Sequence, residues 1–421
     1  MKRRTFLAGA SGVVGHALLG AARDARGEAS RHRFAVIGRG PMGSAAARHL
    51  SEAGEDVVVI GPEEPADWEH HPGPFASHYD EGRQAEFAAH NEGISRLSHA
   101  SAEAFRALQA RTGIEFYRDW PNLWVMPRGF RTDYLDLDRC EALAKQLGVE
   151  LLPLDDAALA ARFPALRFPA DSRGLLEPRG GLINPRRMVQ AQLAAARKAG
   201  ATLVADDVVA LRRKPGELEL ATRGGATLRA DRVLVAAGGF TNASRLLERR
   251  LALSLHGVTV VLVEAPREPR PEIPSVTFVL GSGAGRRTGF AMPPLRYPDG
   301  RYYIKGATAS SVESVLDDAT LVPWYRGAGV REDGPQLVEL LREVLPGFVP
   351  GAVRTLPCMV AYTPSGLPYV DRVDQRIGVV VGGNACGVMT SDELGRLAAA
   401  MMRGAPWTGP LGPELFSARF A

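Results

Sequence analysis

Three glycines with the spacing Gly-x-Gly-x-x-Gly are the residues of this chain that most directly indicate chemistry: Gly38, Gly40 and Gly43. In such a motif the first glycine permits a tight turn, the second lets backbone approach a pyrophosphate, and the third lets a helix pack closely on a strand. The phosphates then bind at the helix N-terminus, where unpaired N–H groups point outward. Together with Pro41 and Met42, these glycines are predicted to bind a dinucleotide. The alternative is a glycine-rich turn without a ligand.

The elements on either side of the motif support this prediction. Residues 34–37 have the apolar composition of a buried parallel strand, residues 44–50 are small residues and good helix formers, and residues 57–60 predict a second strand. This strand–turn–helix–strand order is the context in which the motif indicates dinucleotide binding. A ribose-binding Asp or Glu is expected at the tip of the second strand, but Gly61 occupies that position. Glu63 is either placed to reach the ribose or is a solvated loop acid.

The N-terminal residues have the pattern of an export signal. Adjacent Arg3 and Arg4 precede Phe6 and Leu7, and an apolar, glycine-rich stretch follows. A basic start, a short apolar stretch and small residues describe a secretory signal, and the paired arginines resemble the twin-arginine type. We expect residues 1–28 to be read by the twin-arginine translocase and the mature protein to be periplasmic or secreted. The alternative is an uncleaved N-terminal anchor.

Charge and cysteine content exclude several classes of function. The net charge of +4 is carried by the export signal, so the mature chain is close to neutral and has no basic stripe for nucleic acid. No apolar run long enough to span a bilayer follows the signal. No His/Cys cluster has metal-ligand spacing, so we expect no metal site. Of Cys140, Cys358 and Cys386, at least one is free or chemically engaged, because three cysteines cannot all pair.

Two later blocks repeat the pattern of a buried strand that ends in small residues. Residues 232–239 end with Ala237, Gly238 and another glycine, and residues 377–383 end at Gly383. Small residues at the carboxyl end of a strand let a ligand approach the backbone. Between them, alternating segments predict an antiparallel sheet, and earlier apolar spacing predicts a helix over residues 85–112. We therefore predict an α/β protein with a Rossmann-like dinucleotide domain (residues 33–84, 165–248 and 355–421) interrupted by an antiparallel-sheet α+β substrate domain (residues 85–164 and 249–354).

The order of these motifs resembles the FAD-dependent D-amino-acid-oxidase superfamily, and most closely the branch of monomeric sarcosine oxidase and N-methyl-amino-acid oxidases. The resemblance covers residues 33–403 and is carried by the Gly-x-Gly-x-x-Gly turn, the Ser77-His78 pair, Gly-Leu-Ile-Asn-Pro before a helix, and Cys-Met-Val-Ala-Tyr-Thr-Pro from Cys358. It implies FAD as cofactor, linked covalently through the sulfur of Cys358; the alternative is a buried free cysteine. It further implies cofactor contacts from His78, Arg83, Val208, Gly387 and Met389.

Several positions depart from that branch. In the relatives an arginine and a lysine bind the substrate carboxylate, but the corresponding positions here are Glu86 and Met389, and Arg83 matches only a nearby arginine. The lysine that assists oxygen reduction aligns with Ile304, one residue from Lys305, and neighbouring residues of a strand face opposite sides. The remaining substrate-pocket positions correspond to Phe290, Met292 and Cys386.

The resemblance implies an exported FAD-dependent oxidoreductase that converts an amine to an imine and passes electrons to oxygen or another acceptor. His78 is the titratable candidate at the site mouth, or else a histidine that shapes the flavin pocket, and Lys305 is the second catalytic candidate. Alternatives are an FAD-dependent dehydrogenase of a hydroxylated small molecule and a non-catalytic flavin-binding protein. A nicotinamide-dependent dehydrogenase would need a contiguous nucleotide domain, whereas these motifs extend to Gly383.

Overall fold

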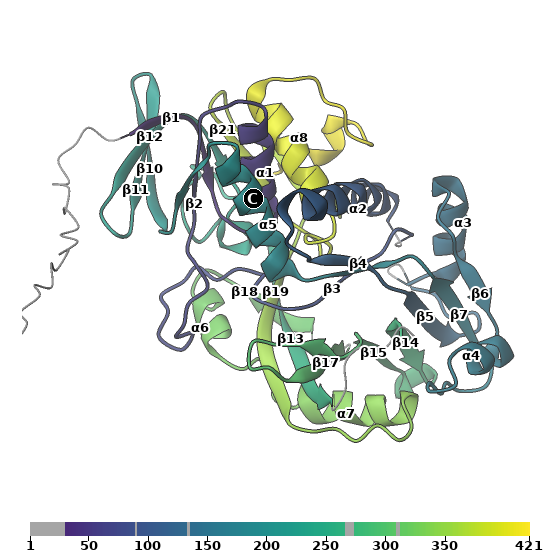
Figure 1. Ribbon diagram of the computed structural model, residues 1–421. Coiled ribbons are helices and arrows are strands. Elements are labelled where there is room, and N and C mark those ends of the chain that lie inside the picture. The colour runs from purple at the N-terminus through teal and green to yellow at the C-terminus, as the bar shows by residue number, and fades with distance from the viewer. Residues whose placement is uncertain (1–29, 89–90, 133–134, 266–272, 309–311) are drawn as a thin grey trace, which may run out of the picture.

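The computed structural model describes residues 30–88, 91–132, 135–265, 273–308 and 312–421, so the predicted export signal lies outside the described residues. Two large sheets and one small three-stranded sheet organise the described residues (Figure 1). The first has eight strands, with parallel β1 (Arg31–Ile37), β2 (Val57–Ile60), β9 (Thr202–Val204), β12 (Thr227–Val235) and β21 (Ile377–Val381), and antiparallel β10 (Val208–Lys214), β11 (Glu217–Thr222) and β20 (Tyr369–Arg372).

Helices cover one face of the first sheet (Figure 1). The N-terminal α1 packs against α5 and α8, and α2 packs against the same two helices. Their apolar faces enclose a core with β1, β2 and β21, in which most side chains are fully buried. The bounds are α1 (Pro41–Glu52), α2 (Glu92–Thr112), α5 (Pro185–Lys198) and α8 (Ser391–Arg403).

The helix expected over residues 85–112 is shorter than predicted. Ala85, the first residue of the predicted helix, instead ends β3 (Arg83–Ala85), which pairs with β8 (Gly181–Ile183). The helix begins after Asn91, whose side-chain oxygen accepts a hydrogen bond from the backbone N–H of Ile94. Periodicity alone did not mark this start, because Ala85 and Phe87, which are buried ahead of the helix, fit the same apolar spacing.

The second sheet has ten strands and lies below the first in Figure 1, with α7 packed on its outer face. Its antiparallel pairing confirms the predicted sheet, and only β14 and β5 pair in parallel. The strands are β5 (Asn122–Pro127), β6 (Leu152–Leu154), β7 (Ser172–Glu177), β13 (Ser254–Ala265), β14 (Ser275–Leu280), β15 (Arg287–Ala291), β16 (Leu295–Arg296), β17 (Tyr302–Thr308), β18 (Val312–Leu316) and β19 (Val353–Tyr362). The remaining elements are β4 (Tyr117–Asp119), α3 (Leu137–Leu147), α4 (Asp156–Arg162), α6 (Leu321–Arg326) and α7 (Asp333–Val344).

The predicted interruption of one α/β unit by an antiparallel sheet is therefore present. Two strands differ from the expected division of the chain. All of β7 and most of β19 lie in segments predicted for the dinucleotide domain, but both strands pair in the second sheet. The reason is that β7 pairs with β5 and β19 pairs along ten positions with β13, which are partners distant in sequence.

A buried ion pair ties α1 to α8 and α5. The guanidinium of Arg48 donates to both carboxylate oxygens of Asp392 at 2.8 and 2.9 Å, and Gln192 donates to the same carboxylate at 2.7 Å. Asp392 is 1% exposed. Burial opposes its ionisation, yet hydrogen bonding to His49 and the charge of Arg48 lower the pKa of Asp392 to about 2. These contacts fix the helices that follow two of the glycine turns.

We expect Arg48→Met to lower the free energy of unfolding by about 3–5 kcal/mol, because it leaves the Asp392 carboxylate buried without its main partner. Because the pKa of Asp392 is depressed in the folded state, the loss is largest above the ordinary carboxyl pKa and vanishes as the pH falls through about 2. Urea unfolding at pH 7 measures it. The control Arg128→Met removes an exposed pair with Asp171 and should cost less than about 1 kcal/mol. Equal losses in the two variants would contradict the prediction.

Candidate functional site

A cavity of about 510 Å³ opens at the carboxyl ends of the central parallel strands. The turn after β1 and the turn after β12 contribute backbone, and the turn after β21 contributes Gly383 and Gly387. The loop that carries Ser77 and His78 forms the opposite wall, and Cys358 of β19 reaches it from the second sheet. The cavity is therefore built where three of the predicted motifs meet. Of the predicted cofactor residues, it is lined by Gly38, Gly40, Pro41, Met42, Ser77, His78, Arg83, Val208, Ala237, Gly238, Cys358, Gly383 and Gly387.

The three glycines of the first turn have three different surroundings. Gly38 has a φ of +113°, and a Cβ there would lie 2.3 Å from the carbonyl oxygen of Ala236. A Cβ on Gly43 would lie 2.0 Å from the carbonyl oxygen of Gly38, so α1 packs directly on the turn. A Cβ on Gly40 would meet no atom within 4 Å. Gly40 faces open space at the N-terminus of α1, as the approach of a pyrophosphate requires.

Unsatisfied polar atoms also indicate that this cavity accommodates a polar ligand. Among the described residues, Arg39 Nε, His78 Nδ1 and Asp207 Oδ1 are buried atoms without a hydrogen-bond partner, and all three residues line the cavity. Buried polar atoms without partners are costly, and a ligand with donors and acceptors would relieve that cost. The residues present therefore fit a dinucleotide such as FAD.

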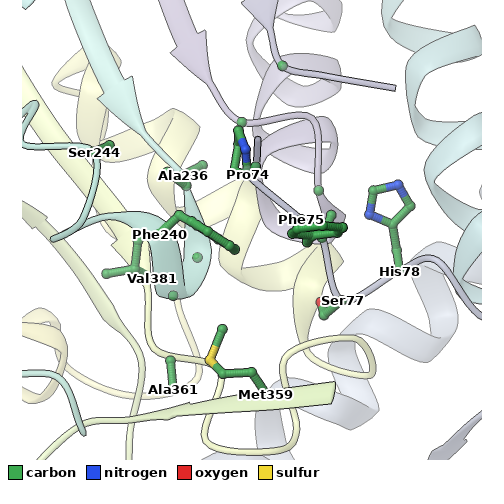
Figure 2. Close-up of a pocket in the computed structure, with 18 of the residues that line it drawn as sticks. Pro74, Phe75, Ser77, His78, Ala236, Phe240, Ser244, Met359, Ala361 and Val381 are labelled. Carbon is green, nitrogen blue, oxygen red and sulfur yellow. The ribbon is translucent and has the colours of Figure 1, made fainter. Parts of the chain in front are cut away.

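An apolar group borders the cavity near β19. Figure 2 shows Phe240 and Met359 extending toward the space beside Phe75, with the imidazole of His78 standing apart from them. Tyr325 completes the group, because its ring stacks on that of Phe75 with centroids 4.9 Å apart. A wall of this kind excludes water from a planar aromatic ligand.

A buried charged cluster lies next to the apolar group. Asp80 accepts hydrogen bonds from Arg83, from Lys305 and from the hydroxyl of Tyr297, the last at 2.8 Å. The ammonium of Lys305 also donates to the backbone oxygen of Gly82 at 2.6 Å. Burial and the charge of Arg83 lower the pKa of Lys305 to about 8, against the opposing effect of Asp80. One carboxylate thus fixes two cations in position.

The strand register settles which residue of β17 faces the site. Ile304 packs in the apolar core between the second sheet and α7, whereas Lys305 points to the loop that carries Asp80 and His78. The alternation of side chains along β17 places the lysine on the cavity side of the sheet. Although the family's lysine aligns with Ile304, Lys305 therefore supplies a lysine on the cavity side of the sheet.

Cys358 lies within electrostatic reach of the cluster. Burial lowers the pKa of Arg83, but the carboxylate of Asp80 and the thiol of Cys358 hold that pKa above its ordinary value. Lys305 is influenced by Cys358 in the same direction. Among the described residues Cys358 is a free cysteine, and its backbone oxygen accepts a hydrogen bond from the indole of Trp324 at 2.7 Å.

His78 is neutral at neutral pH. Burial, together with the guanidinium groups of Arg186 and Arg39, lowers the pKa of the His78 imidazole to about 3. A neutral ring has one donor and one acceptor nitrogen, and Nδ1 has no partner among the described residues. His78 can therefore hydrogen-bond a ligand, but it carries no proton to donate as imidazolium.

The other predicted residues lie outside the cavity. Glu63 has a side chain that is 74% exposed and stands 4.0 Å from the guanidinium of Arg39. Phe290 and Met292 pack with Trp120 and Leu295 in a separate apolar cluster, so the structure does not bring them to the cavity wall. Cys386 and Met389 lie in the segment that follows Gly383. Their side chains pack in the apolar core of the first sheet and its helices.

Glu86 lies beside Met389 and a second buried carboxyl group. The backbone N–H of Glu86 contacts the sulfur of Met389 at 3.5 Å, and no described residue hydrogen-bonds or pairs with its carboxylate. Burial raises the pKa of Glu86 to about 7. Glu177 is 1% exposed and accepts from Asn122 and from the backbone of Phe87, yet burial raises its pKa to about 8.

Sequence reasoning missed the apolar wall of Phe75, Phe240, Met359 and Tyr325, and also four polar residues of the site and its surroundings: Arg39, Asp80, Asp207 and Tyr297. Asp80 lies in a polar loop that resembles any solvated loop, and Tyr297 reaches it from 217 residues away. A sequence signal existed only for Arg39, since it lies inside the glycine motif and faces the tip of the second strand.

No helix among the described residues is long and apolar enough to cross a membrane. Within the same residues, no group of three or more His, Cys, Asp or Glu side chains is arranged to hold a metal ion.

Known proteins share this architecture over nearly the whole chain. N-methyl-L-tryptophan oxidase of Yersinia pestis is 24% identical over 396 residues, which cover 91% of this chain and 98% of the relative. The solved structure of NikD, an unusual amino acid oxidase essential for nikkomycin biosynthesis, matches with a TM-score of 0.75 at 21% identity, over 93% and 98% of the two chains. Glycine oxidase from Geobacillus kaustophilus matches with a TM-score of 0.69 at 19% identity, over 92% and 98%.

A family model for FAD dependent oxidoreductases matches residues 33–401, a span that contains every residue lining the cavity. The chain belongs to this FAD-dependent oxidoreductase family.

Proposed function

We propose that the protein is an exported enzyme that oxidises a C–N bond of an amine-type small molecule to an imine. One observation carries the proposal: Arg83 and Cys358 line one part of a cavity whose other part is a dinucleotide turn, and Lys305 lies behind Arg83 on the same Asp80 carboxylate. FAD, when bound, supplies the acceptor for the two electrons removed from the substrate. The electrons then pass to oxygen or to another acceptor.

The relatives support C–N oxidation. N-methyl-L-tryptophan oxidase and glycine oxidase are enzymes of amino compounds by name, and both match more than nine-tenths of this chain. The apolar wall of Phe75, Phe240 and Met359 supports a planar ring bound out of contact with water.

Covalent attachment of FAD through Cys358 is part of the proposal. The thiolate is the nucleophilic form of cysteine, and Cys358 lines the cavity in the same region as Arg83. Cys386, by contrast, is placed among apolar side chains and beside Glu86, and burial raises the pKa of its thiol. Of these two cysteines, Cys358 has the surroundings that suit a reactive sulfur.

The charges near Glu86 favour a substrate without a free α-carboxylate. Glu86 and Met389 provide no cation, and Arg83 and Lys305 are already paired with Asp80. A carboxylate brought into this region would be desolvated without a partner, at a cost of several kcal/mol. An apolar contact of one or two methylenes returns less than that.

We expect the enzyme to prefer N-methylisobutylamine over sarcosine, which has the same secondary amine but a carboxylate in place of the branched end. The ratio of kcat/KM should favour the amine at least about tenfold, a difference of about 1.4 kcal/mol. Glu86→Gln removes a negative charge that repels the carboxylate of sarcosine. It should therefore raise kcat/KM for sarcosine and lower the ratio of the two kcat/KM values. A preference of the wild-type enzyme for sarcosine would show that a cation reaches the substrate carboxylate.

Covalent attachment is tested by acid precipitation. We expect the flavin of the wild-type protein to remain in the acid pellet, and Cys358→Ala to release it into the supernatant, because the sulfur that bonds it is gone. Absorbance of both fractions measures the distribution. Cys386→Ala is the matched control and should leave the flavin in the pellet. Wild-type flavin released by acid would mean that Cys358 is not the attachment point.

Export is tested at the paired arginines. The double substitution Arg3→Lys and Arg4→Lys should leave precursor in the cytoplasm, because the twin-arginine route recognises two guanidinium groups rather than charge alone. Fractionation and immunoblotting measure the distribution. The control, Arg23→Lys with Arg26→Lys, changes two other arginines of the same segment and should export normally. Normal delivery of the first variant would refute this route.

A further inference from the structure

The part of the cavity next to β2 cannot contain the usual ribose-binding carboxylate. That residue normally lies at the end of the second strand, where this chain has Gly61. A Cβ on Gly61 would lie 2.7 Å from the backbone nitrogen of Arg39 and 3.0 Å from its Cγ. The backbone contact excludes every side chain at this position, so the adenosine half of a dinucleotide must be recognised by other groups.

Arg39 occupies the space that the carboxylate would fill. Its guanidinium donates to the backbone oxygen of Gly61 at 3.3 Å, and its Nε is buried without a partner among the described residues. Glu63 is the nearest acid, but it is 4.0 Å away and mostly exposed. Arg39 therefore lines the cavity with donors that its own surroundings satisfy only in part.

Asp207 provides an acceptor at the same part of the cavity. It is 8% exposed and directly precedes β10. Its Oδ2 accepts from Arg223 at 3.0 Å, whereas its Oδ1 is buried without a partner among the described residues. The backbone N–H of Gly61 donates to the carbonyl oxygen of Val204, three residues before Asp207, at 3.1 Å, and Arg39 and Asp207 both line the cavity.

We propose that Arg39 and Asp207 together recognise the adenosine half of the cofactor. Arg39 donates to ribose hydroxyl oxygens, which reverses the polarity of the usual contact, and Asp207 accepts from a ribose hydroxyl or from the adenine amino group. Arg39, beside the end of β2, and Asp207, directly before β10, thus share the ribose recognition that one carboxylate usually provides. The inference rests on FAD as the cofactor and is independent of the substrate.

The test compares FAD with FMN, which has the same ring system and no adenosine. Apoprotein is prepared in a Cys358→Ala background, so that binding is reversible, and dissociation constants are measured by flavin fluorescence. Arg39→Ala and Asp207→Ala should each weaken FAD binding about tenfold, or about 1.4 kcal/mol, and leave FMN binding unchanged. Arg39→Lys should retain part of the FAD affinity, because it keeps a cationic donor.

Glu63→Ala is the matched control, since Glu63 is the exposed acid beside Arg39, and it should bind FAD normally. The inference is overturned if Glu63→Ala alone weakens FAD binding, if the Arg39 and Asp207 variants have wild-type affinity, or if they lose FAD and FMN equally. Thermal unfolding of each apoprotein identifies a misfolded variant, and Arg39→Gln and Asp207→Asn then replace it. Failure to oxidise any amine would refute the proposed function and leave this result standing, whereas a wild-type protein without FAD affinity would refute both.

Discussion

The close approach of α1 to the turn after β1 is the constraint on which the rest of the site depends. Gly43 rests on the carbonyl of Gly38, and no side chain fits at either position. On its other side α1 is equally close to α8, because a Cβ on Gly395 would lie 2.5 Å from that of Ala45. The buried pair of Arg48 and Asp392 fastens the same two helices. These contacts hold the first and last glycine turns around one cavity, although more than 300 residues separate them.

Charge is arranged differently at the two parts of that cavity. Near β2, Arg39 and Asp207 each have a buried atom without a partner, so this part is prepared for a ligand with donors and acceptors. Near β19, Asp80 already satisfies the cations of Arg83 and Lys305, and the hydroxyl of Tyr297 adds a third donor. Because the pKa of Lys305 is lowered to about 8, the charge of this cluster changes close to neutral pH, unlike that of a lysine in water.

Local sequence signals were sufficient to predict the parallel strands, the three glycine turns and the interrupted α/β architecture. Each depends on residues close together in the chain, such as the Gly38 turn between two apolar strands. Contacts between distant segments could not be predicted. The Asp80 cluster joins residues 225 apart, β19 pairs with a strand about a hundred residues earlier, and the face of Lys305 was decided by the packing of Ile304 on α7. Register, unlike periodicity, is set by the partner strand.

The missing cation beside Glu86 matters more for substrate choice than the charge of Glu86 itself. With a pKa raised to about 7, this carboxyl is partly protonated at neutral pH, and a protonated Glu86 would repel a substrate carboxylate less. Protonation supplies no positive charge, however, and Met389 supplies none either. A substrate carboxylate would have to take Arg83 or Lys305 from Asp80, whose own carboxylate would then be buried with one partner fewer. The selection against carboxylates therefore follows from two cations whose donors Asp80 already engages, and it persists whichever way Glu86 is protonated.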